Sequence, residues 1–158
     1  MKLSISKMMA MLLLASLSLS LGSCDIFSSQ PEAKFSVQAA QYLNPNVYGA
    51  PSPVVLSFYE LKTPYPFKNA TFFQLNQNAA AVLGDSLIDK QTVEVRPNSS
   101  QRVTEVLSPN TQYIGIVAAY RNLDQAVWRE VIKLNPKQKH TSISINLESQ
   151  SLVVNVKQ

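Results

Sequence analysis

The sequence HTSISINLESQSLVVNVK, residues 140–157, carries the clearest signal of secondary structure in the chain. Two parts of it place an apolar side chain at every second position: Ile143, Ile145, Leu147, Leu152, Val154 and Val156. Because successive side chains of a strand point to opposite faces, this period of two predicts two half-buried strands joined as a hairpin. We therefore expect a β-rich fold at the C-terminal end of the chain.

Similar short apolar stretches recur in the preceding part of the chain, with turn residues between them. They predict strands at 35–41, 54–61, 92–96, 102–107, 113–120 and 128–134. About eight strands at this spacing are typical of an all-β sandwich or barrel. Residues 113–120 are apolar on both faces, so we expect this strand in the centre of a sheet.

One segment departs from the strand pattern. Residues 69–83 place Phe72, Leu75, Ala79 and Leu83 at helical spacing. Asn69 is the expected N-cap, and Gly84 follows the expected end. We therefore predict a helical insertion of two short helices at about 69–83.

The N-terminus predicts a lipoprotein. Lys2 and Lys7 precede an apolar run of secretory length, and the run ends in Leu21-Gly22-Ser23-Cys24, which resembles the bacterial lipobox. The resemblance implies a signal peptide over 1–23, diacylglycerol and an N-acyl chain on Cys24, and a lipidated flexible tether over 24–33. A β-sandwich domain then covers 34–158. The alternative is an uncleaved membrane helix beside a free thiol.

Composition excludes several functions. The chain has 158 residues, with one Cys and one His. These cannot form a zinc site or a Cys/His catalytic pair within the chain, so we expect no metal, no cofactor and no enzyme activity. Removal of 1–23 takes away two lysines and leaves 12 Lys plus Arg against 10 Asp plus Glu, a net charge of +2. With so little basic excess, nucleic-acid binding is not expected.

A loop between the first two strands is the candidate binding site. It is rich in Pro and Gly, which restrict or reshape the backbone, and contains apolar side chains that we expect to be exposed. Such a pre-shaped loop loses little entropy when it docks on a protein. The alternative is a connector whose Leu43 and Tyr48 tuck against the sandwich. The partner-binding candidates are Leu43, Asn44, Pro45, Asn46, Val47, Tyr48, Gly49, Ala50, Pro51 and Ser52.

Several motifs in order carry a family resemblance. LNPN (43–46), GAPSPVV (49–55), YELK (59–62), ATFFQL (70–75) and YIGIVAAYRNLD (113–124) resemble segments of TssJ, the lipoprotein family of the bacterial type VI secretion system. The resemblance implies a transthyretin-like sandwich of two four-stranded sheets. It also implies an outer-membrane lipoprotein facing the periplasm. The resemblance further implies that the protein binds the periplasmic C-terminal region of TssM, and through TssM is linked to TssL. Loop 43–52 would contribute to the contact with TssM.

Alternatives to this function stay open at this point. Asp25 follows Cys24, and in enteric bacteria Asp at this position retains lipoproteins in the inner membrane. A small-ligand-binding periplasmic lipoprotein of the same fold would need a deep apolar pocket, which the apolar core leaves little room for. A transthyretin-related hydrolase would need several His. We also expect Arg121, Asp124 and Arg129 to bridge one another between strands.

Overall fold

The computed structural model describes residues 30–157, which fold into eight strands and a helical insertion. The predicted signal peptide, Cys24 and most of the predicted tether lie outside the described residues. The strands are β1 (Glu32–Ala39), β2 (Val54–Leu61), β3 (Leu87–Val95), β4 (Ser100–Val106), β5 (Tyr113–Ala118), β6 (Arg129–Lys133), β7 (His140–Leu147) and β8 (Leu152–Lys157). Between β2 and β3 lie α2 (Tyr65–Asn69), α3 (Phe72–Leu83) and the 3₁₀ turn η1 (Gly84–Ser86).

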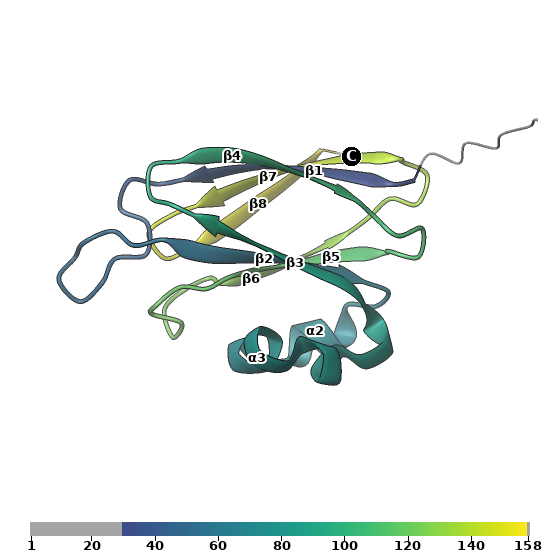
Figure 1. The fold of residues 1–158 in the computed structure, drawn as a ribbon, viewed down its shortest axis with the longest axis horizontal. Helices are drawn as coiled ribbons and strands as arrows, with labels where there is room; N and C mark the ends of the chain where they lie inside the picture. The colour runs from purple at the N-terminus through teal and green to yellow at the C-terminus, as the bar shows by residue number, and fades with distance from the viewer. Residues whose placement is uncertain (1–29, 158) are drawn as a thin grey trace, which may run out of the picture.

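The strands form two stacked four-stranded sheets, which confirms the predicted all-β sandwich (Figure 1). One sheet has the order β4-β1-β7-β8 and the other the order β3-β2-β5-β6. β1 and β7 are parallel, whereas the other neighbouring strands are antiparallel. The predicted C-terminal hairpin is β7 and β8, paired from Ser142↔Lys157 to Leu147↔Leu152.

The first strand begins earlier than expected. β1 begins at Glu32 instead of Phe35, and Ala33 is fully buried. The Glu32 N–H donates to the Lys139 carbonyl at 2.7 Å, and Ala33 pairs with strands on both sides. The predicted boundary between tether and domain, at residues 33 and 34, is therefore two residues too late. The sequence did not predict the start of this strand, because the residues around Ala33 are polar and the small side chain of Ala33 adds little to the hydrophobic pattern although it is buried.

The main core fills the space between the sheets. Alternate residues of β1 and β7 point into it, as the period of two predicts: Ala33, Phe35, Val37, Ile143, Ile145 and Leu147. From the opposite sheet Phe58 meets Phe35 with ring centroids 4.3 Å apart. Burial of these side chains supplies most of the stabilisation, since full burial of a large apolar side chain contributes about 1.5–3 kcal/mol.

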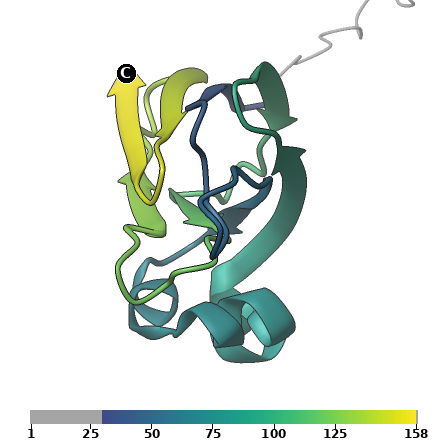
Figure 2. The same ribbon diagram turned by 90° about the vertical axis from the view of Figure 1, so that its left-hand side faces the viewer.

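The central strands of the second sheet are buried on both faces. Leu56 and Phe58 of β2 face the main core, whereas Tyr59 and Leu61 belong to a second cluster beneath the helices. β5 lies between β2 and β6, which confirms its predicted central position. Figure 2 looks along the strands and shows the helices covering only this sheet. The second face of β2 and β5 is apolar because the insertion packs on it.

The insertion comprises two helices, as predicted, but it begins at Tyr65 and not at about Asn69. Asn69 is the last residue of α2 instead of the expected N-cap, and Thr71 caps α3. The Gln74 N–H donates to the Thr71 hydroxyl at 3.3 Å, and the Thr71 N–H donates to the Gln74 side-chain oxygen at 2.8 Å. This reciprocal capping box satisfies two free N–H groups, which a lone Asn69 cap would not do. Gly84 follows the helix at φ 50°, as expected for a C-cap.

A buried tyrosine ties α3 to the sheet. α3 is interrupted at Asn78, which has non-helical angles. The Leu75 carbonyl accepts hydrogen bonds from the Tyr59 hydroxyl at 3.0 Å and from Lys90 Nζ at 3.3 Å. Burial raises the pKa of Tyr59 to about 12 and lowers the pKa of Lys90. Tyr59 therefore stays protonated at ordinary pH and remains a donor to the helix.

Arg129 fastens α2 to β6. Its guanidinium donates to the carbonyls of Phe67 at 3.0 Å and Ala70 at 2.7 Å, and lies 4.7 Å from the Trp128 ring centroid. The expected bridge among Arg121, Asp124 and Arg129 is therefore wrong. The prediction assumed a carboxylate partner for Arg129. The guanidinium instead binds carbonyl groups at the helix ends, which have no partner within the helix.

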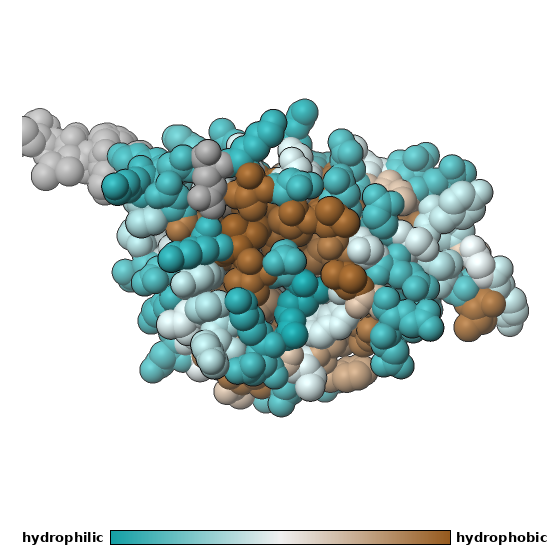
Figure 3. Space-filling view, turned by 180° about the vertical axis from the view of Figure 1, so that it is seen from behind, coloured by the Kyte–Doolittle hydropathy of each residue, from teal (hydrophilic) through white to brown (hydrophobic). Residues whose placement is uncertain are grey.

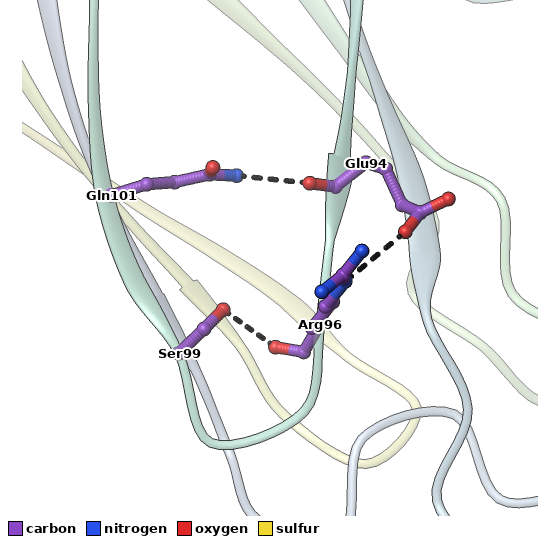
Figure 4. A network of polar contacts seen from close by, with 4 residues as sticks. All are labelled: Glu94, Arg96, Ser99 and Gln101. Atoms are coloured by element: carbon purple, nitrogen blue, oxygen red, sulfur yellow. Dashed lines mark hydrogen bonds and ion pairs between the residues drawn. The ribbon is translucent and has the colours of Figure 1, made fainter.

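The connection between β3 and β4 passes from one sheet to the other through Pro97 and Asn98. Asn98 adopts φ 54°, the left-handed region that Asn tolerates well. Figure 4 shows polar contacts on the two sides of this connection. The Ser99 hydroxyl donates to the Arg96 carbonyl at 2.6 Å, and Gln101 Nε2 donates to the Glu94 carbonyl at 3.4 Å. These bonds define the predicted break after β3.

Candidate functional site

The loop that joins β1 to β2 lies at the end of the sandwich opposite to the start of β1. Figure 1 shows β1 beginning at one end of the sandwich and this loop extending from the other end. β1 runs the length of the sheet between them, from Glu32 to Ala39. The candidate residues 43–52 therefore lie at the end of the sandwich farthest from Glu32.

The base of the loop is part of the core. Leu43 is 0% exposed and packs in the main cluster, so its expected exposure is wrong. The Ser52 N–H donates to the Leu43 carbonyl at 2.9 Å, which closes the base, and Ser52 is buried as well. The alternative in which Leu43 tucks against the sandwich is correct for this residue, because a leucine beside the sheet end gains more from burial than from exposure.

Asn44 joins the loop to two other segments. It is 4% exposed and adopts φ 48°. Its Nδ2 donates to the Pro53 carbonyl at 2.9 Å, and its Oδ1 accepts from the Arg121 N–H at 2.8 Å. Its own N–H donates to the Ser149 carbonyl at 2.9 Å. The Asn44 side chain thus fixes the loop to the connection after β5, and its main-chain N–H fixes the loop to the connection after β7.

A second asparagine shapes the tip. Asn46 Oδ1 accepts from the N–H groups of Tyr48 at 2.9 Å and Ala50 at 3.0 Å. The Asn46 N–H donates to the Ala50 carbonyl, and the Gly49 N–H donates to the Asn46 carbonyl, both at 2.9 Å. Gly49 has φ 78°, which a side chain would disfavour. Residues 46–50 therefore form a closed turn with its own hydrogen bonds.

Val47 and Tyr48 stand out from this turn. They are 93% and 91% exposed, which confirms their expected exposure and contradicts the alternative in which Tyr48 tucks inward. Gly49, Ala50 and Pro51 are exposed beside them, and Pro45 is half-buried. We call residues 46–50 the loop tip. The ten candidate residues thus divide into a buried base and an exposed tip, and their role in binding stays a prediction.

The loop tip borders a groove. It has a volume of about 640 Å³ and is lined by Pro45, Asn46, Val47, Tyr48, Arg121, Asn122 and Gln150. The last three residues come from the connections after β5 and β7. Arg121 and Asn122 belong to the motif of residues 113–124, but nothing in the sequence predicts that they or Gln150 lie beside the loop, because Asn44 joins these segments only in the folded domain.

A larger cavity, of about 830 Å³, lies at the end of the sandwich where β1 begins, which we call the tether end. Its lining includes Pro31 and Glu32 from the start of the domain, Lys62 after β2, and Leu134 and Lys139 from the β6–β7 connection. It lies between loops outside the main core, as the dense packing between the sheets predicts. Two thirds of its lining residues are polar or charged, whereas their apolar groups supply most of the surface that faces the cavity. The lining is therefore mixed, and it lies among loops instead of forming the deep apolar pocket that a small-ligand carrier would need.

An apolar patch is visible where the edges of the two sheets meet (Figure 3). This view from behind faces the side of β6 and β8, which are edge strands. Leu134, Val154 and Val156 on and beside these strands pack against the core while remaining half-buried. The patch is the margin of the core at an open edge of the sandwich.

Chemistry at the described residues is limited to polar contacts. His140 is exposed at the start of β7. Within residues 30–157 no group of three or more His, Cys, Asp or Glu side chains could hold a metal ion. In the same part of the chain, none of the helices combines the length and the apolar character that crossing a membrane requires.

The structure thus presents a hydrogen-bonded loop tip with apolar side chains at one end of a β-sandwich. The model of the family T6SS-SciN, described as "Type VI secretion lipoprotein, VasD, EvfM, TssJ, VC_A0113", matches residues 31–157. The chain belongs to this family, which confirms the resemblance seen in the sequence. The family comprises structural lipoproteins of the type VI secretion system, and membership implies a membrane-associated, periplasm-facing protein.

Solved structures agree with this assignment. The type VI secretion lipoprotein TssJ1 from Pseudomonas aeruginosa is 32% identical, with a TM-score of 0.78 over 82% of this chain and 98% of that chain. The membrane-bound type VI component Lip from Serratia marcescens has 23% identity and a TM-score of 0.75, over 82% and 99% of the two chains. A chain of a type VI membrane complex has 23% identity and a TM-score of 0.70, over 80% and 98%. The last two show the shared fold. No curated protein matches the chain.

Proposed function

We propose that this chain is the lipid-anchored periplasmic component that binds the C-terminal region of TssM and thereby ties the TssL–TssM complex to the outer membrane. Family membership supports a place in the type VI secretion system. The observation that carries the partner contact is the loop tip, with Val47 and Tyr48 more than nine-tenths exposed on a turn that is closed by hydrogen bonds.

The geometry of the loop suits protein recognition. Tyr is among the residues that contribute most to protein interfaces, because its large ring buries much area with few rotatable bonds. Asn44 and Asn46 hold the backbone in place before any partner arrives. Little conformational entropy is therefore lost on docking, and the apolar area of Val47 and Tyr48 can contribute to affinity.

The position of the loop suits a bridge. The described chain and β1 begin at one end of the domain, and the loop tip extends from the other (Figure 1). An anchor at Cys24 would leave the loop tip directed away from the lipid surface, where the periplasmic part of an inner-membrane protein could reach it.

Calorimetry with the periplasmic C-terminal region of TssM from the same organism tests the contact. We expect Val47→Asp with Tyr48→Asp in the mature chain to raise Kd roughly thirtyfold, the scale of a hot-spot loss of about 2 kcal/mol. The matched control is Tyr65→Asp on α2, where the tyrosine is 76% exposed at a distant surface. An unchanged Kd for the loop variant, or equal weakening by the control, would remove the loop from the interface.

The anchor has a separate test. We propose that Cys24 carries the diacylglycerol and N-acyl chains, since three chains at about 0.8 kcal/mol per buried methylene hold a protein on a bilayer. Cys24→Ser should move the protein from the membrane to the soluble fraction and stop secretion. A variant that stays membrane-bound and active would contradict the lipid anchor.

Membrane sorting is the remaining part of the proposal. We propose the outer membrane, although Asp25 matches the residue that retains lipoproteins in the inner membrane of enteric bacteria. Sucrose-gradient separation of the two membranes in the native host decides between them, with Asp25→Ser as the companion variant. Recovery of the unaltered protein with the inner membrane would overturn the outer-membrane assignment.

A further inference from the structure

Four exposed lysines gather at the tether end of the domain. Lys62 follows β2, Lys137 and Lys139 lie between β6 and β7, and Lys157 ends β8. Lys62 and Lys139 line the cavity of about 830 Å³ together with Pro31. Lys157 pairs across the ladder with Ser142, close to the start of β7. We call Lys62, Lys137, Lys139 and Lys157 the basic end.

One acid near Lys62 is exposed: Asp85 precedes Ser86, whose carbonyl accepts from the Lys62 N–H. The other acids considered are paired, hydrogen-bonded or on another side of the domain. Glu32 is paired with Lys34 at 3.1 Å. Glu60 accepts hydrogen bonds from the Ser108 N–H and from Thr111. Asp89 and Glu105 line a small hollow with Glu60 beside β3 and β4, the opposite edge from β6 and β8. The positive charge of the basic end is therefore not cancelled by carboxylates lining the same cavity, apart from the paired Glu32.

From this arrangement we propose that the basic end docks on anionic phospholipid headgroups at the surface of the membrane that carries the anchor. The ammonium group of lysine is a compact charge that suits a phosphate. Each lysine close to an anionic bilayer increases partitioning by roughly fivefold. A cavity of about 830 Å³ also leaves room for a headgroup between the loops.

Chain length keeps this end near the bilayer. Pro31 lies seven positions after Cys24, with six residues between them. Seven positions span at most about 25 Å. Charges attract beyond contact over a Debye length of about 8 Å, and a connection of this length from Cys24 keeps the lysines close to the bilayer that would carry the anchor. Docking would then fix the orientation of the domain as well as its location.

The net charge of the mature chain is too small to cause the proposed lipid binding by itself. It is only +2, so the proposed binding depends on where the lysines lie.

A pair of variants separates lysine position from net charge. The basic-end variant combines Lys62→Gln, Lys137→Gln and Lys139→Gln, and its matched control combines Lys68→Gln, Arg96→Gln and Arg102→Gln. All six side chains are exposed, and each triple variant removes the same charge.

Vesicle co-sedimentation tests the proposal without the anchor. The mature chain with Cys24→Ser is mixed at low ionic strength with phosphatidylcholine vesicles that contain or lack phosphatidylglycerol. We expect binding only to the anionic vesicles, a loss of at least about tenfold in partitioning for the basic-end variant, retention by the control, and release by high salt.

Three outcomes would overturn the proposal. Absence of binding to phosphatidylglycerol vesicles would show that the lysines are only solvated. Equal loss in both triple variants would show that net charge, and not the basic end, is recognised. Full binding by the basic-end variant would assign lipid contact to another surface. Since TssM is absent from the assay, none of these outcomes bears on the proposed loop contact.

Discussion

Replacing Asn44 should loosen the loop from the sandwich and destabilise the whole domain. Asn44→Ala removes the donor to the Pro53 carbonyl and the acceptor for the Arg121 N–H. Two hydrogen bonds at about 1 kcal/mol each account for roughly 2 kcal/mol. Alanine at φ 48° adds about 1 kcal/mol. We therefore expect a loss of about 3 kcal/mol in the free energy of unfolding, which corresponds to roughly 10 °C in Tm.

A comparison of two substitutions separates these contributions. Asn44→Gly also loses both side-chain bonds but accepts the positive φ, so it should cost about 2 kcal/mol and be more stable than Asn44→Ala by about 1 kcal/mol. Urea unfolding of the mature chain with Cys24→Ser measures both. Tyr48→Ala serves as the control within the same loop and should change stability by less than about 0.5 kcal/mol, since Tyr48 is 91% exposed.

Unfolding of Asn44→Ala at the same urea concentration as the unaltered chain would show that the two side-chain bonds do not stabilise the domain. If Asn44→Gly is no more stable than Asn44→Ala, the positive φ carries no cost. A loss confined to TssM binding, with stability unchanged, would mean that Asn44 contacts the partner directly instead of fixing the loop.

Three further predictions concern the rest of the domain. Gly115→Ala should destabilise by about 1–3 kcal/mol in thermal unfolding, because its Cβ would lie 2.6 Å from the Phe67 ring, and adding Phe67→Leu should recover part of the loss. Thr71→Ala should cost about 1 kcal/mol by removing the capping box, whereas an unchanged Tm would show that α3 does not depend on its cap. Glu105 has a pKa raised by burial and by two neighbouring acids, so its ionisation opposes folding. Glu105→Gln should therefore stabilise at pH 7 by less than about 1 kcal/mol, and the gain should disappear below about pH 4, where the carboxyl is protonated in both states. A gain that is independent of pH would contradict this cause.

Elements with a strong period were predictable from the sequence. The alternation around Ile143 and Ile145 located β7, and the apolar character of residues 113–120 placed β5 in the centre of its sheet. These predictions depend on which face of a strand is buried, and the spacing of apolar residues along the strand indicates that face directly. The helical insertion was predictable for the same reason, since its buried residues recur at helical spacing.

The site was only partly predictable, because its geometry depends on contacts between distant segments. Val47 and Tyr48 were correctly expected to be exposed, but Leu43 was not distinguishable from them by residue type. What separates these residues is the position of Asn44, whose side chain bonds to Arg121, 77 positions later in the chain. The groove residues Asn122 and Gln150 escaped prediction for the same reason.

The pairing of β1 has a mechanical consequence. An anchor before Glu32 and a partner on the loop after Ala39 would pull on opposite ends of this one strand. β1 is bonded along its length to β4 on one side and to β7 on the other, from Glu32 to Gln38 in both ladders. Tension along the strand therefore shears many hydrogen bonds at once instead of opening them one after another. Between a lipid and a secretion complex under strain, this domain would transmit force through its most securely held strand.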